Sequence, residues 1–142
     1  MVKANDFLKY LCGELDIKLF TGMVCSGLLP IFNKMDGSFM HYIPTIVEKT
    51  AYGIACGSYI SGVKSAILID YTLLNNIDFK FSTDNGIPLC IISYTSNNIE
   101  DIVSLNHLDL SDDFISDLDR LNNMVFNDKK TTVLRVKEGI LK

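Results

Sequence analysis

The sequence predicts a three-layer α/β/α fold built on a mainly parallel β-sheet. Two uninterrupted apolar runs, residues 65–69 and 88–94, have the pattern of strands that are covered on both faces. Segments with apolar residues at helical spacing alternate with these strands, which is typical of this fold class. A chain of 142 residues can bury one core of ordinary size, so we expect a single domain over residues 1–142.

The composition excludes several classes of protein. Hydrophobic residues make up 48% of the chain and charged residues 21%, which is not the composition of a disordered segment. The net charge of −4 and the scattered lysines argue against a nucleic-acid-binding surface. No apolar run reaches the roughly 20 residues that span a bilayer, so we expect no membrane segment.

The cysteines and histidines do not form a metal-ligand pattern. Cys12, Cys25, Cys56 and Cys90 lack both paired metal-binding spacing and the density of a disulfide-rich secreted domain, so we expect a reducing, cytoplasmic setting and no metal ligands in this chain. We expect one histidine, His41, to be a core or edge residue. The other, His107, is expected at the surface.

The first elements follow from apolar spacing and from turn residues. Apolar residues at helical spacing open the chain, with Asn5 or Asp6 as the expected cap; they are Phe7, Leu8, Leu11 and Leu15. We expect a strand over residues 17–21, a turn over 22–27 and a helix over 28–35 that tolerates Pro30 in its first turn. These are followed by a strand over 39–43.

The next predicted element is a helix that is rich in small side chains. This helix should cover residues 47–61, end at Gly62 and pack closely on the sheet through its small residues, which are Ala51, Gly53, Ala55 and Gly57. The later expectations are a loop and helix over 71–82, a turn at 84–86, a partly irregular stretch over 97–109, a helix over 112–124 and a strand over 131–136.

Ligands of such folds meet the loops at the carboxyl ends of the strands. Three loops occupy this position in the predicted order of elements: residues 22–27, 43–48 and 70–75. We therefore expect the functional site there.

Glu48 is the most informative residue of these loops. It is a lone carboxylate that follows an apolar run and opens a helix of small and apolar residues. Burial disfavours the charged form of a carboxyl group, and an acid of this kind is suited to exchanging a proton with a weakly basic ring nitrogen. The alternative is that Glu48 only interacts favourably with the helix dipole.

Three motifs resemble the pyrimidine-binding domain of thiamine-diphosphate-dependent 2-oxoacid decarboxylases, most closely the sulfopyruvate and phosphonopyruvate decarboxylases. They are Gly22-Met23-Val24-Cys25-Ser26, then Leu28-Leu29-Pro30, and Val47-Glu48 leading into an Ala/Gly-rich helix; the ending Lys137-Glu138-Gly139 is also similar. The resemblance spans nearly the whole chain and implies the fold of that domain.

The resemblance also implies roles for particular residues. Glu48 would hydrogen-bond ring nitrogen N1′ of the cofactor's aminopyrimidine and so activate the cofactor, and Val24 and Asn75 would also contact the cofactor. Ser26, Cys25, Asp70 and Tyr71 would lie near the substrate. A role as a helix cap is an equal alternative for Ser26. For Cys25 the alternative is a small buried thiol with no role in catalysis.

The sequence departs from the family pattern in two loops. In residues 69–75 only Leu73 and Asn75 match, while Thr72 and Leu74 replace glycines and add bulk where the backbone should approach a ligand. Val24 replaces a proline and Lys49 a glycine.

The family's diphosphate- and magnesium-binding motif, Gly-Asp-Gly followed at a distance by Asn, does not occur in these residues. The resemblance therefore implies a hetero-oligomer with a separate diphosphate-binding (beta) subunit that holds the magnesium. The leading interpretation is the pyrimidine-binding (alpha) subunit of a decarboxylase of a small anionic 2-oxoacid, active only with its partner. The alternatives are a non-catalytic assembly or regulatory subunit that keeps the fold and interface, and an unrelated small α/β binding module.

Overall fold

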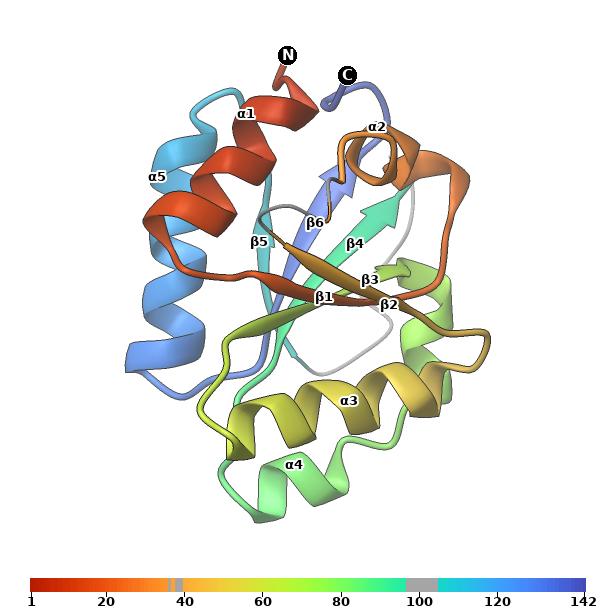
Figure 1. Ribbon diagram of the computed structural model, residues 1–142, viewed down its shortest axis with the longest axis vertical. Coiled ribbons are helices and arrows are strands. Elements are labelled where there is room, and N and C mark those ends of the chain that lie inside the picture. Colours follow the sequence, from red (N-terminus) through yellow and green to blue (C-terminus); the bar gives the residue numbers. More distant parts are fainter. Residues whose placement is uncertain (36, 38–39, 97–104) are drawn as a thin grey trace.

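The computed structural model describes residues 1–35, 37, 40–96 and 105–142 (Figure 1). The described residues form one six-stranded sheet in the order β2-β1-β3-β4-β6-β5, and every neighbouring pair of strands is parallel. The strands are β1 Leu19–Gly22, β2 His41–Pro44, β3 Ser65–Asp70, β4 Cys90–Thr95, β5 Asn106–Asp109 and β6 Thr132–Lys137. The predicted parallel sheet is confirmed.

Helices cover both faces of this sheet, as Figure 1 shows, so the predicted three-layer arrangement is also confirmed. On one face lie α1 Ala4–Lys9, which continues as the π-helical turn Tyr10–Glu14, then α2 Leu29–Phe32, which follows the 3₁₀ turn Ser26–Leu28, and α5 Phe114–Asn122, which continues as the π-helical turn Asn123–Asn127. On the other face lie α3 Glu48–Ile60, the 3₁₀ helix Tyr71–Asn76 and α4 Lys80–Asp84.

Strand β3 shows why an apolar run marks the centre of the sheet. Ala66 and Leu68 belong to the core beneath α1, α2 and α5, while Ile67 and Ile69 belong to the core beneath α3. All four side chains are fully buried. Burial of each Leu or Ile side chain contributes about 1.5–3 kcal/mol, so β3 stabilises both layers at once.

Helix α3 packs on the sheet through its alanines and not through its glycines, contrary to our expectation. Ala51 and Ala55 are buried against the sheet, whereas Gly53 and Gly57 are exposed, and a Cβ atom added to either would meet no atom within 4 Å. At 3.6 residues per turn, positions 51 and 55 share one face of the helix and positions 53 and 57 lie away from it. Gly62, with φ of 84°, ends this helix as predicted.

Several predicted boundaries were wrong. The strand predicted over 39–43 is observed over His41–Pro44, and the helix predicted over 28–35 is only the short α2 after a 3₁₀ turn. The stretch over 97–109 was predicted to be partly irregular, but its residues 106–109 form the edge strand β5. An edge strand tolerates polar residues because one side has no partner; residues 97–104 lie outside the described part. Neither Asn5 nor Asp6 caps α1, because both lie inside the helix.

The two ends of the described chain lie side by side (Figure 1). Val2 and Leu141 form a parallel bridge, and the amide nitrogen of Ala4 donates to the carbonyl oxygen of Lys142 at 2.8 Å. Among the described residues, no helix has the length and apolar character needed to cross a membrane.

Candidate functional site

The carboxyl ends of β1, β2 and β3 lie next to one another in the sheet. Gly22 is paired in register with Pro44 of β2 and with Leu68 of β3. Its φ of 136° is outside the range that other residues readily adopt, and a Cβ atom at this position would lie 1.9 Å from the carbonyl oxygen of Leu68. Only glycine therefore fits at this end of β1, where the backbone lies close to the Leu68 carbonyl group of β3.

The carbonyl group of Gly22 anchors the connection that leads to Glu48. It accepts hydrogen bonds from the amide of Thr45 at 2.8 Å, from the Thr45 hydroxyl at 3.1 Å and from the Tyr42 hydroxyl at 3.3 Å. These bonds fix the segment between β2 and α3 against the end of β1. As a result, the first turn of α3 lies at the edge of the sheet where the loops after β1 and β3 begin.

Glu48 is the first residue of α3 and is half-buried. Its Oε1 accepts a hydrogen bond of 3.3 Å from Nδ2 of Asn76, the last residue of the 3₁₀ helix that follows β3. No other partner of the Glu48 carboxyl group is found among the described residues, so its second oxygen is available to a ligand. The position in the first turn suits the favourable helix-dipole interaction as well.

Asn76 was not identified from the sequence, whereas its neighbour Asn75 was. The two asparagines follow β3 in tandem, and this pair of carboxamide donors is the signal that could have marked the position. Asn75 is exposed, and no hydrogen bond to Glu48 is found for it within the described residues.

Asp70 and Tyr71 are committed to local structure. Asp70 caps the 3₁₀ helix, because its Oδ1 accepts from the amide of Thr72 at 3.0 Å and from the Thr72 hydroxyl at 2.7 Å. Tyr71 is fully buried, and its hydroxyl lies 2.9 Å from Nε2 of His107. A substrate could therefore reach the partly exposed Asp70 but not the side chain of Tyr71. His107 was predicted at the surface; it is half-buried and lies at the wall of a surface groove.

Cys25 and Ser26 lie at the beginning of the 3₁₀ turn after β1. Cys25 is half-buried, and burial raises the pKa of its thiol although the amides of Leu28 and Gly27 oppose this shift. The thiol is thus protonated at neutral pH, which agrees with a small packed side chain. Ser26 is exposed, and it is the first residue of the turn, whose N-cap is Cys25. No hydrogen bond of the Ser26 hydroxyl is found among the described residues, so this group is open to a ligand.

The electrostatic environment of this turn is acidic. The charge of Asp70 adds to burial in raising the pKa of Cys25. Burial and the charges of Glu138 and Asp70 raise the pKa of Tyr94, whose ring packs against Gly27. A bound anion would therefore need positive charge supplied from outside this cluster.

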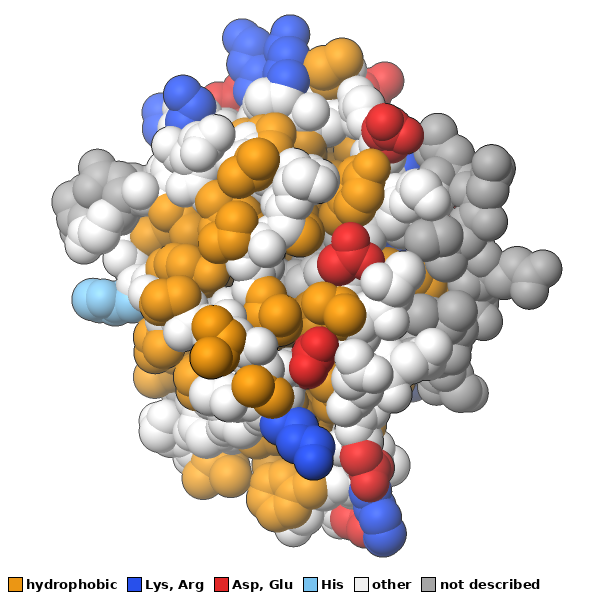
Figure 2. Space-filling model, turned by 90° about the vertical axis from the view of Figure 1, so that its right-hand side faces the viewer, with side chains coloured by type: hydrophobic (Ala, Val, Ile, Leu, Met, Phe, Trp, Pro, Cys, Tyr) orange, Lys and Arg blue, Asp and Glu red, His pale blue; other side chains and the backbone are white. Residues whose placement is uncertain are grey.

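Exposed apolar side chains surround the candidate site. Figure 2 shows the face that carries α2, the end of β2 and the beginning of α3, with hydrophobic side chains gathered in a band and acidic side chains along one margin. We call this band the apolar rim; its members are Val24, Leu29, Ile43, Ile46 and Val47. Ile46, two residues before Glu48, is 91% exposed. Large exposed apolar patches are typical of interaction sites.

The described part of the chain offers no metal centre. No group of three His, Cys, Asp or Glu side chains within it is placed to hold a metal ion, and the four cysteines are free thiols.

Comparison with solved structures identifies the fold. Benzoylformate decarboxylase from Polynucleobacter necessarius superposes with a TM-score of 0.77 at 14% identity over 97% of this chain. The thiamine diphosphate-dependent 4-hydroxybenzoylformate decarboxylase of Rhodococcus jostii RHA1 superposes with a TM-score of 0.73 at 11% identity over 96%. The chain has the fold of a domain of these decarboxylases. It spans only 30% of the length of either.

Sequence comparison adds no relative. No family model matches the sequence, and a search of curated proteins finds no match. The similarity is therefore one of structure, and it extends over nearly all of this chain.

Proposed function

We propose that this chain is the pyrimidine-binding subunit of a thiamine-diphosphate-dependent decarboxylase that acts on a small anionic 2-oxoacid of the sulfopyruvate or phosphonopyruvate type. The observation that carries the proposal is the position of Glu48: the fold is that of a thiamine-diphosphate-dependent decarboxylase domain, and this half-buried carboxyl group lies at the edge of the sheet where ligands bind.

The residues at this edge fit the aminopyrimidine end of the cofactor. The carboxyl group of Glu48 keeps one oxygen for a ring nitrogen while Asn76 holds the other. The exposed side chains of Ile46 and Val47 precede it and offer apolar surface to a planar heterocycle or to a partner protein. When bound, thiamine diphosphate supplies the carbanion chemistry of the decarboxylation, and the protein supplies orientation and electrostatics.

Within this proposal each residue of the chain has a limited task. Glu48 would hydrogen-bond ring nitrogen N1′ through its free carboxyl oxygen, and proton exchange across this bond would activate the cofactor. Asn76 orients the Glu48 carboxyl group through the Nδ2 to Oε1 hydrogen bond. Val24 and Asn75 contribute contacts with the cofactor, and the exposed Ser26 hydroxyl donates to the substrate carboxylate. Cys25 and Asp70 border the proposed substrate position.

A partner subunit completes the proposed site. The Gly-Asp-Gly and Asn motif that binds diphosphate and magnesium is missing from these residues, and the acidic turn around Cys25 and Asp70 supplies no positive charge for an anionic substrate. We therefore assign both tasks to a diphosphate-binding subunit that docks on the apolar rim. The removal of exposed apolar surface from water is the main favourable term in such an association.

A second function is favoured by the loop after β3. Thr72 and Leu74 replace glycines there, and the carboxylate of Asp70 is used as a cap. These features would suit a non-catalytic assembly or regulatory subunit that keeps the fold and the interface.

The two functions are separated by reconstitution. A gene for a protein with the Gly-Asp-Gly and Asn motif next to the gene for this chain would identify the partner. The purified pair, supplied with thiamine diphosphate and magnesium, should release carbon dioxide from sulfopyruvate or phosphonopyruvate. A stable complex that decarboxylates neither substrate would instead support the non-catalytic role.

A further inference from the structure

A groove of about 550 Å³ lies at the opposite edge of the sheet from Glu48. It is formed where β4, β5 and β6 begin, together with the end of α4 and the turn before β6. Its described lining residues are Ser82, Thr83, Gly86, Ile87, Leu105, Asn106, His107, Lys129, Lys130 and Thr131. A volume of this size is within the range of small-molecule sites.

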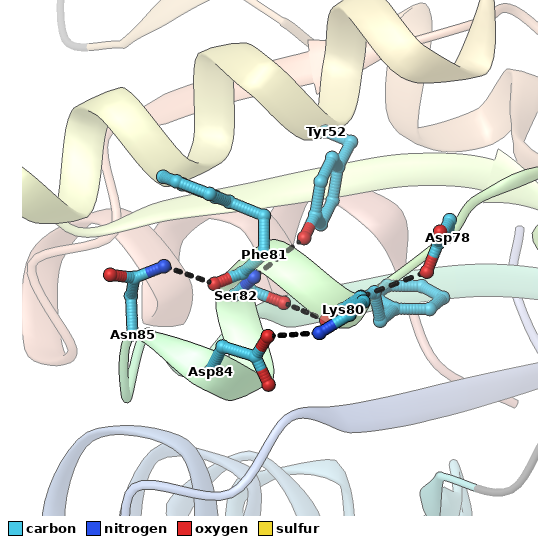
Figure 3. Close-up of polar contacts among 8 residues, drawn as sticks. Tyr52, Asp78, Lys80, Phe81, Ser82, Asp84 and Asn85 are labelled. Carbon is cyan, nitrogen blue, oxygen red and sulfur yellow. Dashed lines mark hydrogen bonds and ion pairs between the residues drawn. The ribbon is translucent and has the colours of Figure 1, made fainter.

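One wall of the groove is held rigidly by α4 (Figure 3). The amide of Ser82 donates to the hydroxyl of Tyr52 on α3 at 2.8 Å, and the Asn85 side chain donates to the carbonyl oxygen of Phe81 at 2.8 Å. The chain then turns back, and the amide of Ile87 donates to the carbonyl oxygen of Ser82 at 2.8 Å. These bonds fix the residues that face the groove before any ligand arrives.

The facing wall is held by the turn before β6 and by His107. The hydroxyl of Thr131 accepts from the amide of Leu89 at 3.1 Å, which ties the turn to the segment before β4. Nε2 of His107 lies 2.9 Å from the hydroxyl of the fully buried Tyr71, so the imidazole ring is fixed at the wall. Lys129 has a φ of 58°, a left-handed conformation that is uncommon for a residue other than glycine.

Among the described residues that line this groove, the charged side chains are both lysines. Lys129 and Lys130 follow one another in the turn, and neither forms an ion pair with a described carboxylate. The ammonium group of Lys129 lies 5.5 Å from the centroid of the Tyr59 ring, a contact that leaves its charge uncompensated. The nearest acids in sequence are Asp84, which is paired with Lys80, and the exposed Asp128.

We propose that this groove binds a small phosphate-bearing anion. Lysine ammonium groups are point charges suited to phosphate, and the hydroxyl of Thr83 and the carboxamide of Asn106 add neutral donors to the lining. The lining has no described arginine, the residue whose fork matches a carboxylate in two hydrogen bonds, so phosphate is the better fit than a carboxylate ligand. The proposal does not depend on the function assigned to Glu48.

The test is a titration of the ¹⁵N-labelled chain, followed by amide chemical shifts. The probes are inorganic phosphate, inorganic pyrophosphate, glycerol 3-phosphate and, as a carboxylate control, citrate. Saturable shifts at Thr83, Gly86 and Thr131 with the phosphate probes are expected. Tighter binding of glycerol 3-phosphate than of the inorganic ions would assign the site to a phosphorylated metabolite, and the reverse order to free phosphate.

Two double variants test whether the lysines of the groove bind the phosphate, one as the test and one as the control. Lys129→Gln with Lys130→Gln should weaken binding about tenfold or more, because charged hydrogen bonds are lost. Lys3→Gln with Lys34→Gln removes the same charge from exposed positions elsewhere and should leave the affinity unchanged. If the first pair unfolds the chain, Lys130→Gln alone replaces it. Shifts that do not saturate, equal binding by both double variants, or tighter binding of citrate than of phosphate would overturn the proposal.

Discussion

Glu48 has a carboxyl group with one oxygen held by Asn76 and the other free among the described residues. In the reconstituted enzyme, Glu48→Gln should lower the turnover number by about 100-fold to 10,000-fold, since the amide is nearly isosteric but cannot exchange the proton. Steady-state decarboxylation measures this effect. Glu14→Gln, which changes an exposed glutamate on the π-helical turn after α1, is the matched control and should leave turnover unchanged.

A Glu48→Gln enzyme within a few-fold of the parent would show that Glu48 does not activate the cofactor. Circular dichroism and size-exclusion chromatography of the pair would establish that folding and assembly are intact in either case.

Gly22 is important for its backbone conformation, whereas Glu48 is important for its side chain. Gly22→Ala would place a Cβ atom 1.9 Å from the Leu68 carbonyl oxygen at a φ of 136°, so we expect the free energy of unfolding to fall by about 2–4 kcal/mol. Gly57→Ala is the control. No atom lies within 4 Å of its added Cβ, and alanine should stabilise this helical position by about 0.5–1 kcal/mol.

Urea unfolding of the two glycine variants gives both free energies in one experiment. Equal effects of the same sign would refute the claim that Gly22 is required by its φ and by its close approach to Leu68.

Cys90 links stability to alkaline pH. Burial raises the pKa of its thiol from an ordinary value of 9.0 to about 12, because the thiolate is disfavoured in the core. The folded chain therefore holds the proton more tightly than the unfolded chain. The resulting stability is fully present below pH 9.0 and is lost progressively as the pH rises toward about 12.

Cys90→Val should make the fall in unfolding free energy above pH 9.0 less steep, since one thiol no longer titrates differently in the two states. Urea unfolding below and above this pH compares the two proteins. If the unfolding free energies of the parent and the variant fall in parallel above pH 9.0, the raised pKa of Cys90 is contradicted.

At the scale of elements, α4 depends on its attachment to α3. Tyr52→Phe removes the acceptor of the Ser82 amide, and a backbone donor that loses its partner costs about 1–3 kcal/mol (Figure 3). We expect this loss to appear as faster amide hydrogen exchange at Ser82 and the rest of α4. Tyr59→Phe, on the same helix, removes a hydroxyl for which no hydrogen bond is found among the described residues, and exchange in α4 should then be unchanged.

The central elements could be predicted from the sequence because their burial has a sequence signal. Residues 65–69 and 88–94 read as strands since both faces of β3 and β4 are covered. The edge strand β5 could not, because it begins with Asn106 and His107 and ends with Asp109, which resemble a polar loop. Helix α3 was located correctly, but its inward face was not, because Gly and Ala are equally small and differ only in helical phase.

The meeting of the three candidate loops was predictable, but the contacts of their side chains only in part. Loops 22–27, 43–48 and 70–75 do meet at one edge, as parallel strands require. The partner of Glu48 was missed, because Asn75 and Asn76 are chemically identical and only the turn of the 3₁₀ helix decides which one reaches the carboxylate. Tyr71 and His107 are paired across 36 positions, a contact that no local pattern reveals.

At the scale of the whole molecule, the apolar rim and the free oxygen of Glu48 lie at the same edge of the sheet. An isolated chain leaves this edge open to water, where a single carboxyl group and a few apolar side chains provide little binding energy. Association with a diphosphate-binding subunit would cover the rim and close the site. The central claim is thus that cofactor binding belongs to the pair and not to this chain alone.

Isothermal titration of thiamine diphosphate, in the presence of magnesium, into the isolated chain and into its mixture with the Gly-Asp-Gly subunit tests this claim most directly. We predict no measurable heat of binding for the chain alone and saturable, magnesium-dependent binding for the mixture that exceeds the binding of the partner by itself. Tight, magnesium-dependent binding to the isolated chain would contradict it, as would a mixture that binds the cofactor no better than the partner alone.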